Sequence, residues 1–267
     1  EATREQLITT MVGRKLTEMF PKTEVQAGDT ALEVIGLTAP ALKNISFKAK
    51  KGEIFGIYGL LGSGHLDIGP AIYGQTILSG GQILVNGVER KIRNPLNALK
   101  SGIAYVPAER KVEGLILNMS VRHNILASLY VKSDHIRWIR KAFEMKISKK
   151  WIEKLRIKTP SSEAKTESLS GGNQQKVTLA KCLELEPDVL ILNEPTRGID
   201  VGAKVEIYRI LDDLAQKGKC VIIVTSEMPE LLTMSDRIMV MHDGIVGGIF
   251  GKREATQEII LQHAIGG

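Results

Sequence analysis

A glycine-rich string, Gly59–Leu66, follows a short apolar run and precedes an apolar helix signal that extends to Ile72. Glycines at a strand-to-helix turn let backbone N–H groups approach phosphate oxygens at a helix N-terminus. The string matches the pattern GxxxxGK[ST] at both glycines, but His65 replaces the lysine and Leu66 replaces the hydroxyl residue that would hold Mg²⁺. A glycine turn without any ligand is the alternative interpretation. The candidate phosphate-contacting residues are Gly59, Gly62, Ser63, Gly64, His65 and Leu66.

A second string, Leu169–Lys176, reads Leu-Ser-Gly-Gly-Asn-Gln-Gln-Lys and precedes a helix signal that runs to about Leu185. A serine followed by two glycines can cap a helix and leave its first N–H groups open to an anion. An ordinary capped helix start is the alternative, although the string is more specific than a cap requires. The candidate residues are Ser170, Gly171, Gly172, Asn173 and Gln174.

A third string places Asn193 and Glu194 directly after the apolar run Val189–Leu192. Ligands of α/β folds bind at the carboxyl edge of the sheet, where such a pair would lie. In P-loop ATPases an Asp at the first position holds Mg²⁺ and the acid that follows polarises the attacking water. Asn193 is a much poorer ligand for a hard cation, so we predict no metal ligand in this chain. Glu194 alone could be an ordinary surface residue.

The elements that position these strings alternate between strand and helix. Strands are expected at 31–35, 45–49, 54–58, 82–85, 102–106, 189–193, 221–225, 237–241 and 245–249, and a helix at 203–216. The runs at 189–193 and 221–225 are apolar throughout, which is typical of parallel strands buried on both faces. Asp243-Gly244 predicts a hairpin turn between the last two strands. This alternation indicates an α/β domain with a mainly parallel sheet.

The segment between Val121 and Lys158 carries helix signals. Its longest piece, Ile136–Leu155, places Ile136, Ile139, Phe143, Ile147, Trp151 and Leu155 on one face. A basic amphipathic helix of this kind could lie on a membrane surface, whereas a solvated helix packed on its own domain is the simpler expectation. Near the start of the chain, apolar residues at helical spacing predict a helix over 4–19, followed by a polar linker to Asp29.

Composition limits the possible classes of protein. The chain has 267 residues, 43% of them hydrophobic and 25% charged, with a formal net charge of +6. These values exclude a disordered, collagen-like or coiled-coil architecture, and the apolar runs are too short to cross a bilayer. Cys182 and Cys220 lack metal-ligand spacing and are expected to be buried thiols. The histidines at 123, 135, 242 and 263 likewise lack paired metal spacing.

Together these strings resemble an ATP-binding cassette (ABC) transporter ATPase. Leu169–Lys176 resembles the signature sequence of that family. Thr196–Lys204 and Ser226–Glu230 narrow the resemblance to ATPases of monosaccharide importers of the ribose, galactose and xylose type. Those proteins carry two fused halves, and the chain is similar to the second. The resemblance implies a RecA-like parallel core, an antiparallel β subdomain near the N-terminus and a helical subdomain over about 118–168. It assigns residues 1–29 to a linker helix from a preceding half and 30–267 to the nucleotide-binding domain.

The resemblance also implies roles. Two ATPase halves face head to tail, so Ser170–Gln174 and Asp200 would contact ATP and Mg²⁺ held by the first half of the same polypeptide. Glu227 stands where the family has a switch histidine, and Asn193 and Leu66 replace the usual Mg²⁺ ligands. Glu194 would then be a vestigial carboxylate, and the isolated half weakly active or inactive as an ATP hydrolase.

The expected partners follow from the same resemblance. Pro107–Asn124 would dock on transmembrane permease subunits at the cytoplasmic face of a bacterial membrane. These permease subunits would receive a sugar from a binding protein. Two other functions stay open: a nucleotide-free pseudo-ATPase scaffold, and a soluble ABC protein acting on nucleic acid. The second rests only on the positive charge, and no nucleic-acid partner is expected.

Overall fold

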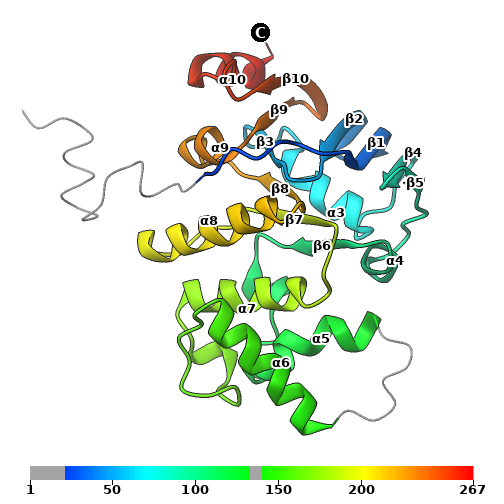
Figure 1. Cartoon of the computed structure of the whole chain (residues 1–267). Helices are drawn as coiled ribbons and strands as arrows, with labels where there is room; N and C mark the ends of the chain where they lie inside the picture. The colour runs from blue at the N-terminus through cyan, green and yellow to red at the C-terminus, as the bar shows by residue number, and fades with distance from the viewer. Residues whose placement is uncertain (1–21, 133–139, 267) are drawn as a thin grey trace, which may run out of the picture.

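The computed structural model describes residues 22–132 and 140–266, which form two sheets flanked by helices (Figure 1). The helix expected over residues 4–19 lies outside the described residues. Within them, one sheet has four strands in the order β2-β1-β4-β5 and the other has six strands in the order β10-β9-β3-β8-β7-β6.

The four-stranded sheet is antiparallel throughout. Its strands are β1 (Thr30–Ala39), β2 (Leu42–Lys50), β4 (Gly80–Val85) and β5 (Val88–Glu89). Along β2 buried and exposed residues alternate, because successive side chains point to opposite faces and only one face packs on the core. This sheet is the antiparallel β subdomain that the sequence predicted.

The six-stranded sheet holds the parallel strands β3 (Ile54–Gly59), β6 (Ile103–Val106), β7 (Val189–Asn193), β8 (Cys220–Val224) and β9 (Arg237–His242). Strand β10 (Ile245–Gly251) adds antiparallel to β9. Asp243 and Gly244 join them with φ of 45° and 80°, as a two-residue turn with positive φ at both positions requires. The predicted strands are confirmed, although β8 ends one residue before Thr225.

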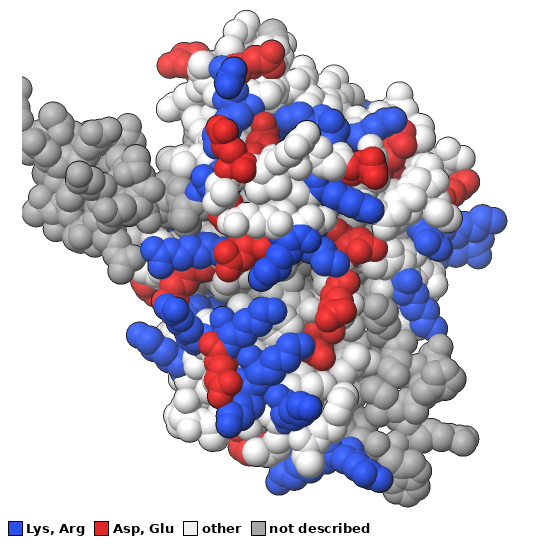
Figure 2. Space-filling model, viewed as in Figure 1, with Lys and Arg blue, Asp and Glu red and all other residues white. Residues whose placement is uncertain are grey.

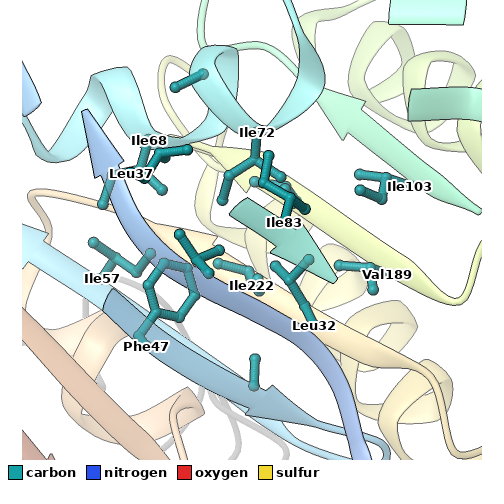
Figure 3. Close-up of a cluster of buried hydrophobic side chains, with 14 of the residues drawn as sticks. Leu32, Leu37, Phe47, Ile57, Ile68, Ile72, Ile83, Ile103, Val189 and Ile222 are labelled. Atoms are coloured by element: carbon teal, nitrogen blue, oxygen red, sulfur yellow. The ribbon is translucent and has the colours of Figure 1, made fainter. Parts of the chain in front are cut away.

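A hydrophobic core fills the space between the two sheets and helix α3 (Ile68–Tyr73). Figure 3 shows Leu32, Phe47 and Ile83 of the antiparallel sheet facing Ile57 and Ile222 of the parallel sheet. A second core on the other face of the parallel sheet includes residues of α7 (Gly171–Leu183) and α8 (Val201–Gln216). The remaining helices of the core are α4 (Pro95–Lys100), α9 (Met228–Met234) and α10 (Gln257–Ile265), with short turns at His65–Asp67, Arg110–Gly114 and Thr166–Ser168.

Helices α5 (Val121–Lys132) and α6 (Lys141–Lys154) lie beside α7 (Figure 1). Arg122 of α5 ties the group together by donating hydrogen bonds to Glu144 of α6 and to Glu163. The predicted apolar face of α6 is correct at Ile147, Trp151 and Leu155, which are buried. It is wrong at Phe143, which is 48% exposed, because the first turn of α6 meets α5 through Glu144, the buried partner of Arg122 and Tyr130. Residues 136–139 of the predicted helix lie outside the described residues.

Residues 22–28 run along the core domain and are held there by polar contacts. The Thr23 backbone N–H and hydroxyl donate to the two carboxylate oxygens of Asp212 on α8 at 2.9 and 2.8 Å. Lys22 forms an ion pair with Asp236 at 3.0 Å. The polar segment before β1 is therefore fixed to α8 and to the start of β9.

Within residues 22–132 and 140–266, no helix is long and apolar enough to cross a bilayer. Both cysteine thiols are free and buried, as predicted, and burial raises the pKa of each. The histidines bind neighbouring groups: His123 contacts Ser120, His242 contacts Ala264 and His263 contacts Ile259. His135 lies outside the described residues.

Candidate functional site

The order of the parallel strands brings three of the predicted strings to one edge of the sheet. Strand β8 lies between β3 and β7, and all three run in the same direction. The loop after β3, the Asn193–Glu194 pair at the end of β7 and Thr225–Glu227 after β8 therefore meet at the carboxyl edge, where α/β folds bind ligands.

The glycine-rich loop is enclosed by two turns from elsewhere in the chain. Gly62 and Gly64 have φ of 87° and 82°, a region that residues with a Cβ rarely adopt. A Cβ on Gly64 would lie 2.4 Å from the carbonyl oxygen of Ala41, in the turn between β1 and β2. The backbone N–H of Gly244, in the turn between β9 and β10, donates to the carbonyl of Ser63 at 3.0 Å. These contacts fix the path of the loop.

His65 is buried beneath this loop and has 3% of its surface exposed. Its Nδ1 is 2.8 Å from the Ser63 hydroxyl, and its Nε2 is buried without a hydrogen-bond partner among the described residues. Burial lowers the pKa of His65 to about 4, and the opposing effect of Asp67 is smaller. The imidazole is therefore neutral near pH 7, so it does not provide the positive charge that a phosphate-loop lysine provides.

Asn193 contacts the same loop from the end of β7. Its Nδ2 donates to the backbone carbonyl of Leu66 at 2.7 Å, and its Oδ1 is buried without a partner among the described residues. No group of three or more His, Cys, Asp or Glu side chains in the described part of the chain could hold a metal ion. With a neutral His65, an apolar Leu66 and an amide at position 193, this loop does not fit Mg²⁺ and a triphosphate.

Glu194 is turned toward β8. Its φ is 45°, and its backbone N–H donates to the Val224 carbonyl at 2.8 Å. The Oε1 atom accepts hydrogen bonds from the backbone N–H and the hydroxyl of Ser226 at 2.8 and 2.5 Å. Only 8% of Glu194 is exposed. These bonds orient the carboxylate toward Ser226, in the loop after β8.

Glu227 is the N-cap residue of α9, at the end of the loop after β8. Both of its carboxylate oxygens accept from Lys204 Nζ of α8 at 2.7 Å. An exposed ion pair of this kind contributes little to stability, but it links the loop after β8 to the first turn of α8, which Asp200 caps.

Glu230 is a further acid at this edge that sequence reasoning missed as a site residue. It is 1% exposed, and its carboxyl group bonds the hydroxyls of Thr225 at 2.7 Å and Thr196 at 3.4 Å. Burial raises the pKa of Glu230 to about 7, and the hydrogen bond from Thr225 opposes this rise. The sequence shows an acidic residue shortly after the predicted strand 221–225, and this could have marked Glu230 as a candidate. The spacing of residues along the chain does not reveal that the carboxyl group is buried.

The Ser170–Asn173 segment begins α7, as predicted, but its bonding differs from a simple cap. Ser170 occupies the N-cap position, yet its hydroxyl accepts from Asn173 Nδ2 at 2.9 Å and no helix N–H donates to it. The Ser170 side chain is exposed and free to meet another molecule. Gln174 lies apart, because it is buried and donates to the Thr166 carbonyl.

The two glycines allow close packing around the start of α7. A Cβ on Gly172 would lie 2.5 Å from the Cβ of Ala203 on α8, and one on Gly171 would lie 2.8 Å from the Arg110 guanidinium. Asp200 caps α8 by accepting from the Ala203 N–H at 3.0 Å. The glycines therefore place the beginnings of α7 and α8 side by side.

An open cavity of about 350 Å³ lies at this junction. Ser170, Gly172, Asn173 and Asp200 line it together with the basic residues Arg156, Lys158, Lys176 and Arg209. Exposed hydroxyl and amide groups at a helix N-terminus with basic neighbours suit a phosphate group. Glu206 also lines the cavity and pairs with Lys176, so Arg156, Lys158 and Arg209 are its other cations.

Arg110 connects this face to the loop after β6. Its guanidinium donates to the carbonyl oxygens of Arg197 and Gly198 at 2.8 and 3.3 Å. Burial lowers the pKa of Arg110, and Glu109 opposes the shift. Glu109 also forms an ion pair with Arg197 at 2.8 Å. The start of the Pro107–Asn124 segment is thus attached to the loop that precedes Asp200.

Comparison with known proteins gives relatives of high identity. The chain is 46% identical over 267 residues to a ribose import ATP-binding protein RbsA of Clostridium tetani, covering 99% of this chain and 53% of the relative. It is 44% identical over 276 residues to a xylose import ATP-binding protein XylG of Thermoanaerobacter pseudethanolicus, covering 99% of the chain and 54% of the relative. The chain therefore spans about half the length of these relatives.

Solved structures share the fold at lower identity. A nucleotide-free ATP-binding cassette from an ABC transporter superposes with a TM-score of 0.76 at 21% identity, covering 90% of this chain and all of the other. A dimeric cassette in a post-hydrolysis state bound to ADP and Pi superposes with a TM-score of 0.72 at 21% identity, covering 84% and 100%. The family model for ABC transporters matches residues 42–197. With this match, these relatives and the P-loop ABC fold, the chain belongs to the ABC transporter family as an ATPase domain.

Proposed function

We propose that the chain is an ATP-binding half-subunit of an importer that couples ATP binding and hydrolysis to uptake of a monosaccharide. The names of relatives at 44–46% identity, which are ribose and xylose import ATP-binding proteins, support the substrate class. The other half of the active assembly is the first ATPase half of the same polypeptide. Residues 1–29 form the linker from that half, 30–267 form the nucleotide-binding domain, and about 118–168 form its helical subdomain.

The proposal is asymmetric. The loop Gly59–Leu66 lacks a cation, because His65 is neutral and buried. The start of α7 offers an exposed Ser170 beside a basic cavity. This contrast between the two faces is the observation on which the proposal rests: the chain contributes its signature residues to ATP bound by the partner half and has a degenerate site of its own.

At the composite site, Ser170, the backbone N–H groups of Gly171 and Gly172, and Asn173 would bind the outer phosphates of the partner's nucleotide. Asp200 would signal across the seam between the two halves. Bound Mg-ATP supplies the phosphoanhydride bond whose hydrolysis drives the transporter. This chain's residues orient the phosphates, and the close packing of α7 on α8 fixes the position of Ser170 beside Asp200. Glu194 takes no part in this chemistry, because Ser226 holds its carboxylate.

The partners are membrane permeases, which receive the sugar from a binding protein, and the chain works as a peripheral subunit at the cytoplasmic face of the membrane. The docking surface is Pro107–Asn124. In it Val112, Ile116 and Met119 are exposed, an arrangement that favours a protein contact. The bonds of Glu109 and Arg110 to residues 197–198 give this surface a direct path to Asp200.

Two substitutions in the full-length protein, reconstituted with its permease in liposomes, test the proposal. Ser170→Arg is expected to abolish transport-coupled ATP hydrolysis, because it places a long side chain where phosphate must approach. Glu194→Gln is expected to change hydrolysis by less than about twofold. A severe defect from Glu194→Gln, with normal expression and assembly, would overturn the asymmetric model.

A pseudo-ATPase scaffold that binds no nucleotide is the second candidate, and the neutral His65 with the Asn193–Leu66 bond favours it. Calorimetric titration of the chain with Mg-ATP, with phosphate release followed in the same sample, separates the two. Absence of binding supports the scaffold, whereas binding without turnover assigns a regulatory site to Gly59–Leu66. Sustained turnover by the chain alone contradicts both.

A further inference from the structure

A second cavity, of about 330 Å³, lies between α6, the end of α7 and the second half of α8. None of the predicted site residues lines it. Its lining combines an apolar floor with a charged rim. The floor includes Trp151, Leu155, Leu183, Leu190, Ile210 and Leu214.

Four lysines, Lys150, Lys154, Lys217 and Lys219, line the same cavity. The ammonium groups of Lys150 and Lys154 lie 4.9 and 4.5 Å from the ring centre of Trp151. Figure 2 shows many blue Lys and Arg side chains, with red Asp and Glu side chains among them, on the face where Figure 1 places α6, α7 and α8. The four lysines thus lie beside the apolar residues of the cavity.

Two carboxylates, Glu186 and Asp213, line the cavity beside the four lysines, and two more lie nearby. Glu184 already accepts from Trp151 Nε1 and pairs with Lys150, and Asp188 pairs with Lys219 at 3.5 Å. Among the described residues, no carboxylate lies within ion-pair distance of Lys154 or Lys217. Burial and then the charges of Lys217 and Lys150 lower the pKa of Lys154, and the charges of Glu184 and Glu186 oppose this shift. An anion entering the cavity would relieve this repulsion.

We propose that the cavity binds a small organic anion with an apolar body, whose anionic head contacts Lys154 and Lys217 and whose body packs on Trp151 and Leu214. The volume suits a ligand of one or two rings or a short acyl chain. A sugar without a charged group would leave the lysines unpaired, so the ligand differs in class from a neutral monosaccharide. The assignment is independent of the proposed transport function.

The cavity lies against the ends of two helices, α7 and α8, whose first residues belong to the candidate site. Leu183 lies at the end of the helix that Ser170 begins, and Leu214 lies near the end of the helix that Asp200 caps. A ligand packed there contacts both helices on their shared side.

The test uses two fluorescent probes of similar size. Anilinonaphthalene sulfonate is an aromatic anion, and phenyl naphthylamine is its uncharged counterpart. The chain is expected to bind the anion at one saturable site. The double variant Lys154→Gln/Lys217→Gln should raise the Kd for the anion about tenfold and leave the Kd for the neutral probe unchanged. The matched control Lys91→Gln/Lys252→Gln, at exposed lysines elsewhere, makes the same change in net charge.

A second variant tests the location. Leu214→Trp fills the cavity and should abolish binding of both probes while the thermal unfolding midpoint stays near that of the parent chain. The proposal is overturned if the anion does not bind, if it binds the lysine variant as tightly as the parent, or if both probes are weakened equally. Persistence of binding in Leu214→Trp would place the probe elsewhere and would also overturn it.

Discussion

The side-chain amide of Asn193 donates a 2.7 Å hydrogen bond to the backbone carbonyl of Leu66 and so joins the end of β7 to the glycine-rich loop after β3. An aspartate, the usual residue at this position in P-loop ATPases, would place a carboxylate against that carbonyl oxygen instead. Asn193 therefore has a structural role at this position.

The variant Asn193→Asp should lower the free energy of unfolding by about 1–3 kcal/mol near pH 7, because a donor becomes a buried acceptor. The loss should shrink near pH 4, where a protonated Asp can again donate to Leu66. Denaturant unfolding at both pH values measures this. Asn118→Asp, at an exposed position, is the control, and an equal loss in both variants would refute the role of the Asn193–Leu66 bond.

The buried imidazole of His65 leads us to predict a second pH dependence of the free energy of unfolding. Its pKa is about 4 in the folded chain and near 6.5 when unfolded. Between these values the unfolded chain binds more protons, so the contribution of His65 is complete above pH 6.5 and is lost as pH falls toward 4. The total is about 3 kcal/mol. His65→Gln should remove this slope and His123→Gln should keep it. Equal slopes for His65→Gln and the parent chain would show that His65 is not buried.

The pKa of Glu230 shifts on folding in the opposite direction to that of His65. Its pKa is raised from 4.5 to about 7 on folding, so the folded chain binds more protons between these values. Its contribution is complete below pH 4.5 and is lost as pH rises through 7. Glu230→Gln, which mimics the protonated acid, should gain stability relative to the parent between pH 4.5 and 8, by about 3 kcal/mol. The exposed Glu254 gives the control Glu254→Gln, and a constant difference between Glu230→Gln and the parent would contradict the shift.

From the close approach of α7 and α8 we predict the effect of a substitution at Gly172 on stability and on ATP hydrolysis. Gly172→Ala places a Cβ 2.5 Å from that of Ala203, so the helices must separate at a cost of about 1–3 kcal/mol. In the full-length transporter the same change should lower coupled ATP hydrolysis, because it displaces Ser170 from Asp200. Gly80→Ala, whose Cβ would lie 4.0 Å from Thr38, is the matched control. Normal stability of Gly172→Ala would refute the close packing.

The positions of the strands along the chain and the strings at their ends could be predicted from the sequence, because buried parallel strands are continuous apolar runs and turns have characteristic residues. Their order in the sheet comes only from the structure. The paired turn residues Asp243 and Gly244 even fixed the hairpin between β9 and β10. Phe143 was misplaced, since helical spacing gives a face but not how much of that face a neighbour covers.

The chemical state of the site could not be predicted. Motif comparison identified His65 and Asn193 as departures, but their burial and bonds depend on contacts with residues far away in the chain. The same holds for Glu230, whose partners Thr196 and Tyr208 reach it only once β7, α8 and α9 are packed. Whether a side chain gains or loses charge on folding depends on how it is packed in the structure. The spacing of residues in the sequence does not show this.

The attachment of Thr23 to Asp212 connects the segment before β1 to one helix of the core. Asp212 lies 12 positions after Asp200 on α8, a span of about 18 Å of continuous helix. Residues 22–28 are therefore joined through the backbone of α8 to the loop that Asp200 ends, along a route that does not pass through the sheet.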